Sequence, residues 1–155
     1  MPAIVVIAHQ PLASALEQAA RHVFSRDPRC CEYRLCALDV EPDADLAALE
    51  QRARSLLAEA DDGRGVLVLT DCLGATPANV AARMAQPGKV EVVAGVSLPM
   101  LLRALCYCDL ALDALAEKAI AGGTRGVVPI GPVPLPDHRQ TAVRDNDLAR
   151  LQDQQ

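Results

Sequence analysis

Two polar residues follow apolar runs in this chain, and their types suit phosphoryl-transfer chemistry. His9 directly follows the apolar run 3–8, and Asp71 directly follows the run 65–70. A neutral imidazole is a competent nucleophile, and a carboxylate at one ring nitrogen fixes the tautomer and stabilises positive charge as the other attacks phosphorus. Pro11 suits the first turn of a helix beside the imidazole. We therefore predict that His9 accepts a phosphoryl group and that Asp71 orients its ring.

A loop of small residues follows Asp71 and allows an anion to approach the backbone closely. It contains Gly74, Ala75 and Thr76, and Pro77 indicates that a helix begins here with Thr76 as its N-cap. Backbone N–H groups, the Thr76 hydroxyl and the positive end of a helix dipole favour a bound phosphate. The loop lacks the Gly-Lys-Ser/Thr signature of a nucleotide P-loop, so we predict a cradle for a phosphoryl group instead.

Five apolar runs predict strands. They lie at residues 3–8, 33–38, 65–70, 90–96 and, more weakly, 126–130. The first, third and fourth runs are almost unbroken, which is typical of strands covered on both faces in a parallel sheet.

The segments between these runs have helical periodicity. The predicted helices cover residues 12–23, residues 46–60, a segment beginning near Pro77, and residues 99–122 with a break near Cys108 and Asp109. Asp43 is placed to cap the second helix, and Gly63 lies past its end.

The alternation of strands and helices predicts an α/β fold. We expect a three-layer α/β/α sandwich of the flavodoxin-like type, with a mainly parallel sheet in strand order 2-1-3-4 and residues 126–130 as a C-terminal edge strand. Ligands of such sheets bind beyond the carboxyl ends of the strands, where the strand order reverses. Strands one and three are neighbours at that point, so His9 and Asp71 should face one another.

Composition excludes several classes of function. The chain has 155 residues, of which only 2% are aromatic, and a net charge of -5 without a basic cluster, which disfavours binding to nucleic acid. No apolar run is long enough to span a membrane, and the N-terminus lacks a basic leader, so we expect a cytoplasmic protein. The six cysteines lack the paired C-x-x-C spacing of structural zinc sites, so we predict buried thiols, no metal and no cofactor.

Three stretches resemble the IIA domains of mannose-type sugar phosphotransferase systems. They are Ile7-Ala8-His9, the segment from Leu69 through Asp71-Cys72-Leu73-Gly74-Ala75-Thr76-Pro77 to Asn79, and Ala94-Gly95-Val96-Ser97-Leu98-Pro99-Met100-Leu101. By this resemblance, the phosphocarrier protein HPr phosphorylates His9, Asp71 is its carboxylate partner, and Thr76 lies in the phosphate-binding loop. The region around Ser97, Pro99 and Met100 borders the partner-docking surface.

The resemblance also implies an organisation. It covers residues 1–131 as one phosphocarrier domain. By its composition, the segment 132–155 is a proline-rich and polar tail that either holds a short helix at 145–151 or is disordered. Family members are homodimers that exchange a C-terminal strand, which corresponds to residues 126–130 here. Some relatives continue into a IIB domain, so we expect the phosphoryl acceptor of this chain to be a separate IIB-type or regulatory protein. Contact with a membrane would be indirect, through a transporter complex.

The chain departs from the family pattern at several positions. Gln10 stands where the family often has Gly, and Ser97 where it often has Asn. The loop Gly74-Ala75-Thr76 stands where the family commonly has two glycines and a serine. Gln10 lies close to the docking surface, where its side chain can alter the choice of partner without abolishing phosphorylation.

Two other functions stay open at this level. A tetrapyrrole metal chelatase also places a histidine after its first strand, but it needs further His or carboxylate ligands at strand ends, and the fourth strand here ends near Ser97. A non-catalytic dimeric regulator with the same fold is the other alternative, and Gln10 leaves it open. Neither His22 nor His138 has a setting comparable to that of His9.

Overall fold

Strands and helices alternate along the chain. A computed structural model describes residues 1–27 and 33–131. Its elements are β1 (Ala3–His9), α1 (Leu12–Val23), β2 (Leu35–Val40), α2 (Leu46–Ala60), β3 (Val66–Thr70), α3 (Thr76–Ala82), β4 (Val90–Ala94), α4 (Leu98–Cys106) and α5 (Leu112–Arg125). The predicted tail at 132–155, with its short helix, lies outside the described residues.

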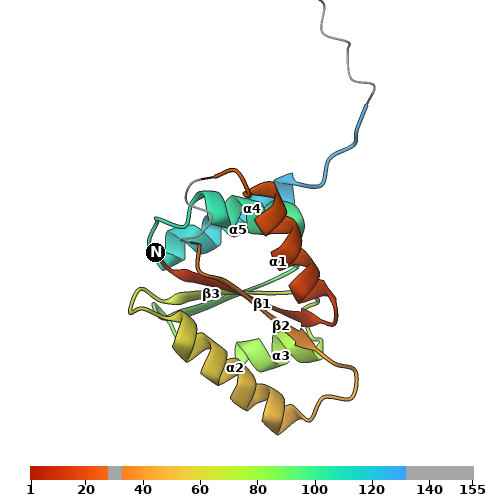
Figure 1. Cartoon of the computed structure of the whole chain (residues 1–155), viewed down its shortest axis with the longest axis vertical. Coiled ribbons are helices and arrows are strands. Elements are labelled where there is room, and N and C mark those ends of the chain that lie inside the picture. The colour runs from red at the N-terminus through yellow and green to blue at the C-terminus, as the bar shows by residue number, and fades with distance from the viewer. Residues whose placement is uncertain (28–32, 132–155) are drawn as a thin grey trace, which may run out of the picture.

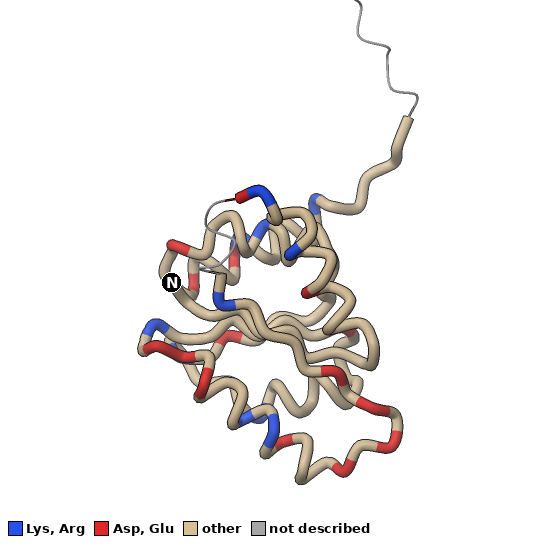
Figure 2. Tube along the Cα trace, viewed as in Figure 1, with Lys and Arg blue, Asp and Glu red and all other residues tan. Residues whose placement is uncertain are grey.

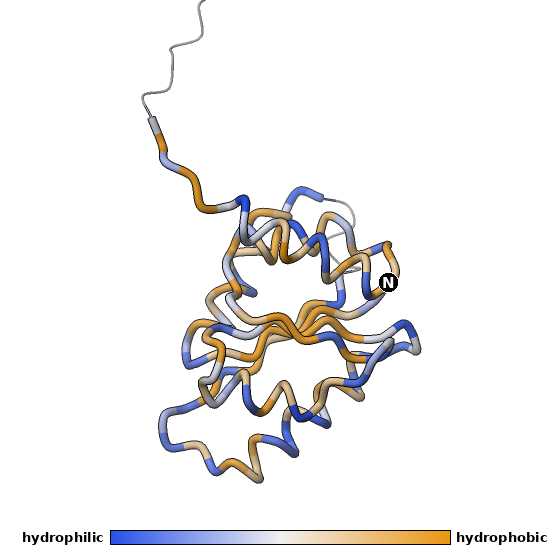
Figure 3. Tube along the Cα trace, turned by 180° about the vertical axis from the view of Figure 1, so that it is seen from behind, coloured by the Kyte–Doolittle hydropathy of each residue, from blue (hydrophilic) through white to orange (hydrophobic). Residues whose placement is uncertain are grey.

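The four strands form one parallel sheet in the order β2-β1-β3-β4, as predicted. Helices α1, α4 and α5 cover one face, and α2 and α3 cover the other (Figure 1). Alternate residues of β1 point to opposite layers: Ile4 and Val6 pack with the first group of helices, whereas Val5 and Ile7 pack with the second. Because both faces are covered, apolar residues run continuously through the central strands (Figure 3).

The helices form largely where their periodicity predicted, but their caps differ. Asp45 caps α2, because it directly precedes the helix and its carboxylate accepts a hydrogen bond from the backbone N–H of Ala48 at 2.8 Å. The predicted cap, Asp43, lies too far ahead of the helix and is exposed. Thr76 is the first residue of α3 and not its N-cap; Ala75 takes that place without a side-chain hydrogen bond. The predicted break in the 99–122 region separates α4 from α5.

The predicted strand at 126–130 does not form within the described chain. Helix α5 continues to Arg125, and Gly126, its C-cap, packs closely against Pro99. The backbone then leaves the helical layer away from the sheet, so it cannot reach the edge of β4 in the same chain (Figure 1). Val127 and Ile130 are 86% and 91% exposed.

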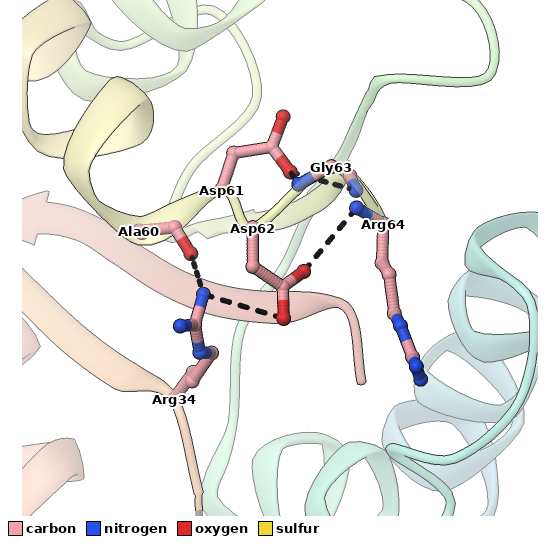
Figure 4. A network of polar contacts seen from close by, with 7 residues as sticks. Arg34, Ala60, Asp61, Asp62, Gly63 and Arg64 are labelled. Atoms are coloured by element: carbon pink, nitrogen blue, oxygen red, sulfur yellow. Dashed lines mark hydrogen bonds and ion pairs between the residues drawn. The ribbon is translucent and has the colours of Figure 1, made fainter.

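Local hydrogen bonds stabilise the turn between α2 and β3, which lies at the amino-terminal ends of the parallel strands (Figure 4). The Asp61 carboxylate accepts hydrogen bonds from the backbone N–H groups of Gly63 and Gly65 at 2.8 and 2.9 Å. Arg34 joins this turn from the other side, donating to the carbonyl of Ala60 at 2.9 Å and pairing with Asp62 at 3.5 Å. These charged groups are therefore engaged in holding the turn.

Gly65 has a steric reason to be glycine. Its φ of +88° lies in the left-handed region, and a Cβ atom there would stand 2.9 Å from the carbonyl oxygen of Lys89. The close approach lets the start of β3 pair with the segment before β4.

None of the helices within residues 1–27 and 33–131 is long and apolar enough to cross a membrane.

Candidate functional site

The carboxyl ends of β1 and β3 bring His9 and Asp71 into contact. In the parallel register Ile7 pairs with Thr70, so His9 at the end of β1 and Asp71 just beyond β3 come together where the strands end. Oδ2 of Asp71 accepts hydrogen bonds from the backbone N–H of His9 at 2.9 Å and from its ring Nδ1 at 2.6 Å. The two residues are 62 positions apart in the sequence, and the contact predicted from topology is confirmed.

Burial distinguishes the two partners. The Asp71 side chain is only 8% exposed, whereas the His9 imidazole is 51% exposed. Oδ1 of Asp71 also accepts a hydrogen bond from the backbone N–H of Cys72 at 2.7 Å, so both carboxylate oxygens have donors. The carboxylate therefore forms a fixed support beneath an accessible ring.

These contacts set the ionisation of Asp71. Burial acts to raise the pKa of its carboxyl group. The hydrogen bonds from the backbone of His9 and Cys72 and from the His9 ring, with the charge of that ring, act in the opposite direction and outweigh it. The pKa of Asp71 therefore lies below its ordinary value of 3.8. At neutral pH the group is a carboxylate, which can only accept hydrogen bonds.

This arrangement assigns the two ring nitrogens different tasks. Because its partner is a carboxylate, Nδ1 must be the donor in the 2.6 Å hydrogen bond. In the neutral ring the lone pair then belongs to Nε2. The pair can therefore present Nε2 as a nucleophile and stabilise the positive charge that the ring acquires when Nε2 forms a bond.

The predicted phosphate-binding loop begins two residues after Cys72, at Gly74, and leads into α3. Gly74 has a φ of +85°, a left-handed conformation that favours glycine. The Asn79 side chain donates to the Gly74 carbonyl at 3.0 Å, and the Ala75 N–H donates to the Cys72 carbonyl at 3.1 Å, which together define the turn. Thr76 is exposed at the start of α3. Within the described residues, no hydrogen bond joins this loop to His9.

The predicted docking residues lie in different environments. Gln10 and Pro99 are exposed. The Ser97 hydroxyl caps α4 by accepting a hydrogen bond from the backbone N–H of Met100 at 3.3 Å. The Met100 side chain is 5% exposed and approaches Gly123 in the core, so it can support this surface only from within.

Sequence reasoning missed two residues at this edge. Asp39, near the end of β2, accepts a hydrogen bond from the backbone N–H of Ser14 at 3.1 Å and so ties the start of α1 to the sheet. Its signal was a carboxylate near the carboxyl end of a strand, the same signal that identified Asp71. Leu73, the residue after Cys72, is 90% exposed. Only the tertiary structure reveals this exposure of an apolar side chain.

The other histidines and the cysteines do not extend this site. His22 is exposed on α1, and His138 lies outside the described residues. Within the part of the chain that the structure describes, no three His, Cys, Asp or Glu residues are grouped to hold a metal ion. Among the described cysteines, Cys36 lies in β2, where burial raises the pKa of its thiol, and Cys108 is buried.

Comparison with known proteins places this geometry among related chains. A family model described as "PTS system fructose IIA component" matches residues 3–120. The mannose-specific EIIAB component of Escherichia coli K12 is 34% identical over 93 residues, which are 58% of this chain and 29% of that protein. This chain therefore matches less than a third of the length of that curated relative. The fructose-specific EIIA component of Bacillus subtilis is 27% identical over 106 residues, covering 68% of this chain and 69% of the relative.

Solved structures share the fold. The phosphotransferase system component EIIA of Streptococcus agalactiae superposes with a TM-score of 0.71 at 22% identity, covering 83% of this chain and 97% of that one. The mannose/sorbose-specific IIA subunit of Enterococcus faecalis gives a TM-score of 0.70 at 24% identity, with coverages of 86% and 98%.

The lowered pKa of Asp71 predicts how Asp71→Asn changes stability with pH. A depressed pKa stabilises the folded state above the unfolded value of 3.8, and this contribution is lost as pH falls through the folded pKa. We expect the variant to be less stable than wild type at neutral pH and the difference to shrink below about pH 4. Urea unfolding across a pH series measures it, with Asp43→Asn, an exposed carboxylate outside the site, as control. A difference that stays constant down to low pH would contradict the expectation.

Proposed function

The chain belongs to the mannose/fructose EIIA family of sugar phosphotransferase systems, and we propose that His9 is the residue that carries the phosphoryl group. The observation that supports this most directly is the hydrogen bond between Nδ1 of His9 and Asp71 at 2.6 Å, with the imidazole half exposed. HPr is the proposed donor, and a separate IIB-type or regulatory protein is the proposed acceptor. Control of another pathway by phosphorelay suits the chain as well as sugar uptake does.

The transfer exchanges one nitrogen–phosphorus bond for another. The lone pair on Nε2 of His9 attacks phosphorus while the bond to the histidine nitrogen of HPr breaks, and the bonding electrons stay on the donor nitrogen. The His9 ring retains its proton on Nδ1 and becomes positively charged. The Asp71 carboxylate balances that charge, and backbone N–H groups of the 74–76 loop stabilise the equatorial oxygens of the transferring group. The second transfer runs the same steps in reverse toward the acceptor.

A second copy of the chain is the proposed partner in a homodimer. All five residues of β4 are half-buried, although β4 is an edge strand with three valines. In the segment 127–130, the apolar side chains of Val127, Val128 and Ile130 are exposed. An open strand edge pairs readily with another chain, so exchange of the segment between two copies would cover both features.

The identity of the phosphorylated residue is open to a direct test. Incubation with phosphoenolpyruvate, enzyme I and HPr should give one acid-labile, base-stable phosphoryl group. We expect the group to be lost in His9→Ala and kept in His22→Ala, the matched control on α1. Phosphate on His9→Ala, or none on wild type, would contradict the proposal. Insertion of a metal into a porphyrin-like ring would instead support the chelatase alternative.

Asp71→Ala should slow transfer more than it weakens folding. A hydrogen bond to a charged group contributes about 1.5–3 kcal/mol, which corresponds to roughly 10- to 100-fold in rate. In the resting protein the truncation removes hydrogen bonds at the end of β3 but little of the apolar core. Rapid-quench phosphorylation by HPr measures the loss of transfer rate, and urea unfolding measures the loss of folding stability. Both losses can then be compared as free energies. A transfer rate equal to wild type would remove the role assigned to Asp71.

The dimer is tested through the exposed segment. Wild type should run as a dimer in size-exclusion chromatography with light scattering. Val128→Asp should shift it toward monomer, because strand exchange would place a charge on a covered face of the sheet. Val23→Asp, which changes a half-exposed valine on α1, is the control and should leave the dimer intact. A monomeric wild type would contradict the strand exchange.

A further inference from the structure

Thr70, the last residue of β3, carries a buried hydroxyl group that has no hydrogen-bond partner in the described part of the unphosphorylated protein. The residue is 0% exposed, and its Oγ1 has no hydrogen-bond partner among the described residues. A buried polar group without a partner lowers stability, and most such groups in folded proteins are satisfied. Val66 and Val68 fill the same face of this strand with apolar side chains of nearly the same shape, so packing alone does not require the hydroxyl.

The strand register places this hydroxyl beside the proposed site. Thr70 directly precedes Asp71, and its partner on β1 is Ile7, two residues before His9. By the alternation of β3, the Thr70 side chain lies on the α2/α3 face together with Ile7 and Val68. His9 is on the same face of β1 by the same rule. The orphan hydroxyl therefore lies beneath the layer that carries the start of α3.

The start of α3 is also incompletely satisfied. Its N-cap, Ala75, offers no side-chain hydrogen bond, whereas a Ser, Thr, Asp or Asn there would accept from the first-turn N–H groups. Pro77 and Ala78 are buried, and α3 packs on both β1 and β3. The uncapped helix start at Ala75 thus follows Thr70 closely in the chain, and α3 packs on the strand that carries the buried hydroxyl. The loop is better matched to a state that holds an anion than to the resting state.

We propose that Thr70 is a positioning residue for the phosphorylated protein. When the phosphoryl group on His9 draws the 74–76 loop toward it, the Thr70 hydroxyl forms with the backbone at the start of α3 the hydrogen bond that it lacks at rest. That bond holds the loop donors on the phosphoryl oxygens. Thr70 acts through the loop, because its hydroxyl has no exposed surface with which to touch the phosphoryl group. The inference rests on His9 being the phosphorylated residue.

The test compares Thr70→Val, which removes the hydroxyl and keeps the shape, with Thr70→Ser, which keeps the hydroxyl. Each full-length protein is phosphorylated with phosphoramidate, a small donor that bypasses HPr, and the lifetime of the phosphohistidine is followed by ³¹P NMR. Thr124→Val, whose hydroxyl donates to the Ile120 carbonyl far along α5, is the control for the same substitution elsewhere. Urea unfolding of the unphosphorylated proteins gives the resting stability.

We expect Thr70→Val to be at least as stable as wild type at rest, but to lose its phosphoryl group about three- to tenfold faster, the equivalent of one hydrogen bond. Thr70→Ser should restore the lifetime, and Thr124→Val should match wild type. An unchanged lifetime in Thr70→Val overturns the proposal, and so does a Thr70→Ser variant as short-lived as Thr70→Val. A loss of resting stability in Thr70→Val also overturns it, since the hydroxyl would then be satisfied at rest. These outcomes leave phosphorylation of wild-type His9 intact, whereas failure of wild type itself refutes the proposed function.

Discussion

The hydrogen bonding of the Asp71 carboxylate is the interaction on which the rest of the site depends. Its two oxygens accept from the His9 backbone, the His9 ring and the Cys72 backbone, so one side chain ties together the ends of β1 and β3. The same contacts hold the carboxylate ionised and fix which ring nitrogen keeps the proton. One side chain therefore supports the imidazole and sets its tautomer, and both effects depend on the parallel pairing of the two strands.

The two edges of the sheet use charged residues in different ways. At the amino-terminal ends of the strands, the Asp61 carboxylate accepts hydrogen bonds from backbone N–H groups of its own turn. Arg34 donates a hydrogen bond to the carbonyl of Ala60 (Figure 4). At the carboxyl-terminal edge, the imidazole is half exposed and one ring nitrogen is left for chemistry. The exposed acidic residues of the β2–α2 loop lie at this same edge (Figure 2): Glu41, Asp43 and Asp45. The exposed surface there therefore carries acidic side chains, and Leu73, just beyond β3, adds an exposed apolar one.

The covered sheet makes this edge rigid. Every residue of β3 is buried, and so is every residue of β1 before His9. The departures from the family pattern at Gln10 and Ala75 lie in loops beyond the strand ends, and Thr76 is the exposed first residue of α3. None of these three residues takes part in the hydrogen bonds that place His9 over Asp71.

Local patterns in the sequence determined the elements and their order. Unbroken apolar runs predicted buried parallel strands, helical periodicity predicted α1 and α2, and polar residues after two of the runs identified His9 and Asp71. These signals are readable because they depend on residues close together in the chain. Tertiary structure alone decided the rest. Which atoms join Asp71 to His9, the burial of Met100 and the unpartnered hydroxyl of Thr70 depend on how the segments meet in space. Apolar character at 126–130 predicted a strand, yet a strand needs an edge to pair with, and the direction in which α5 ends carries this segment away from the edge of its own sheet.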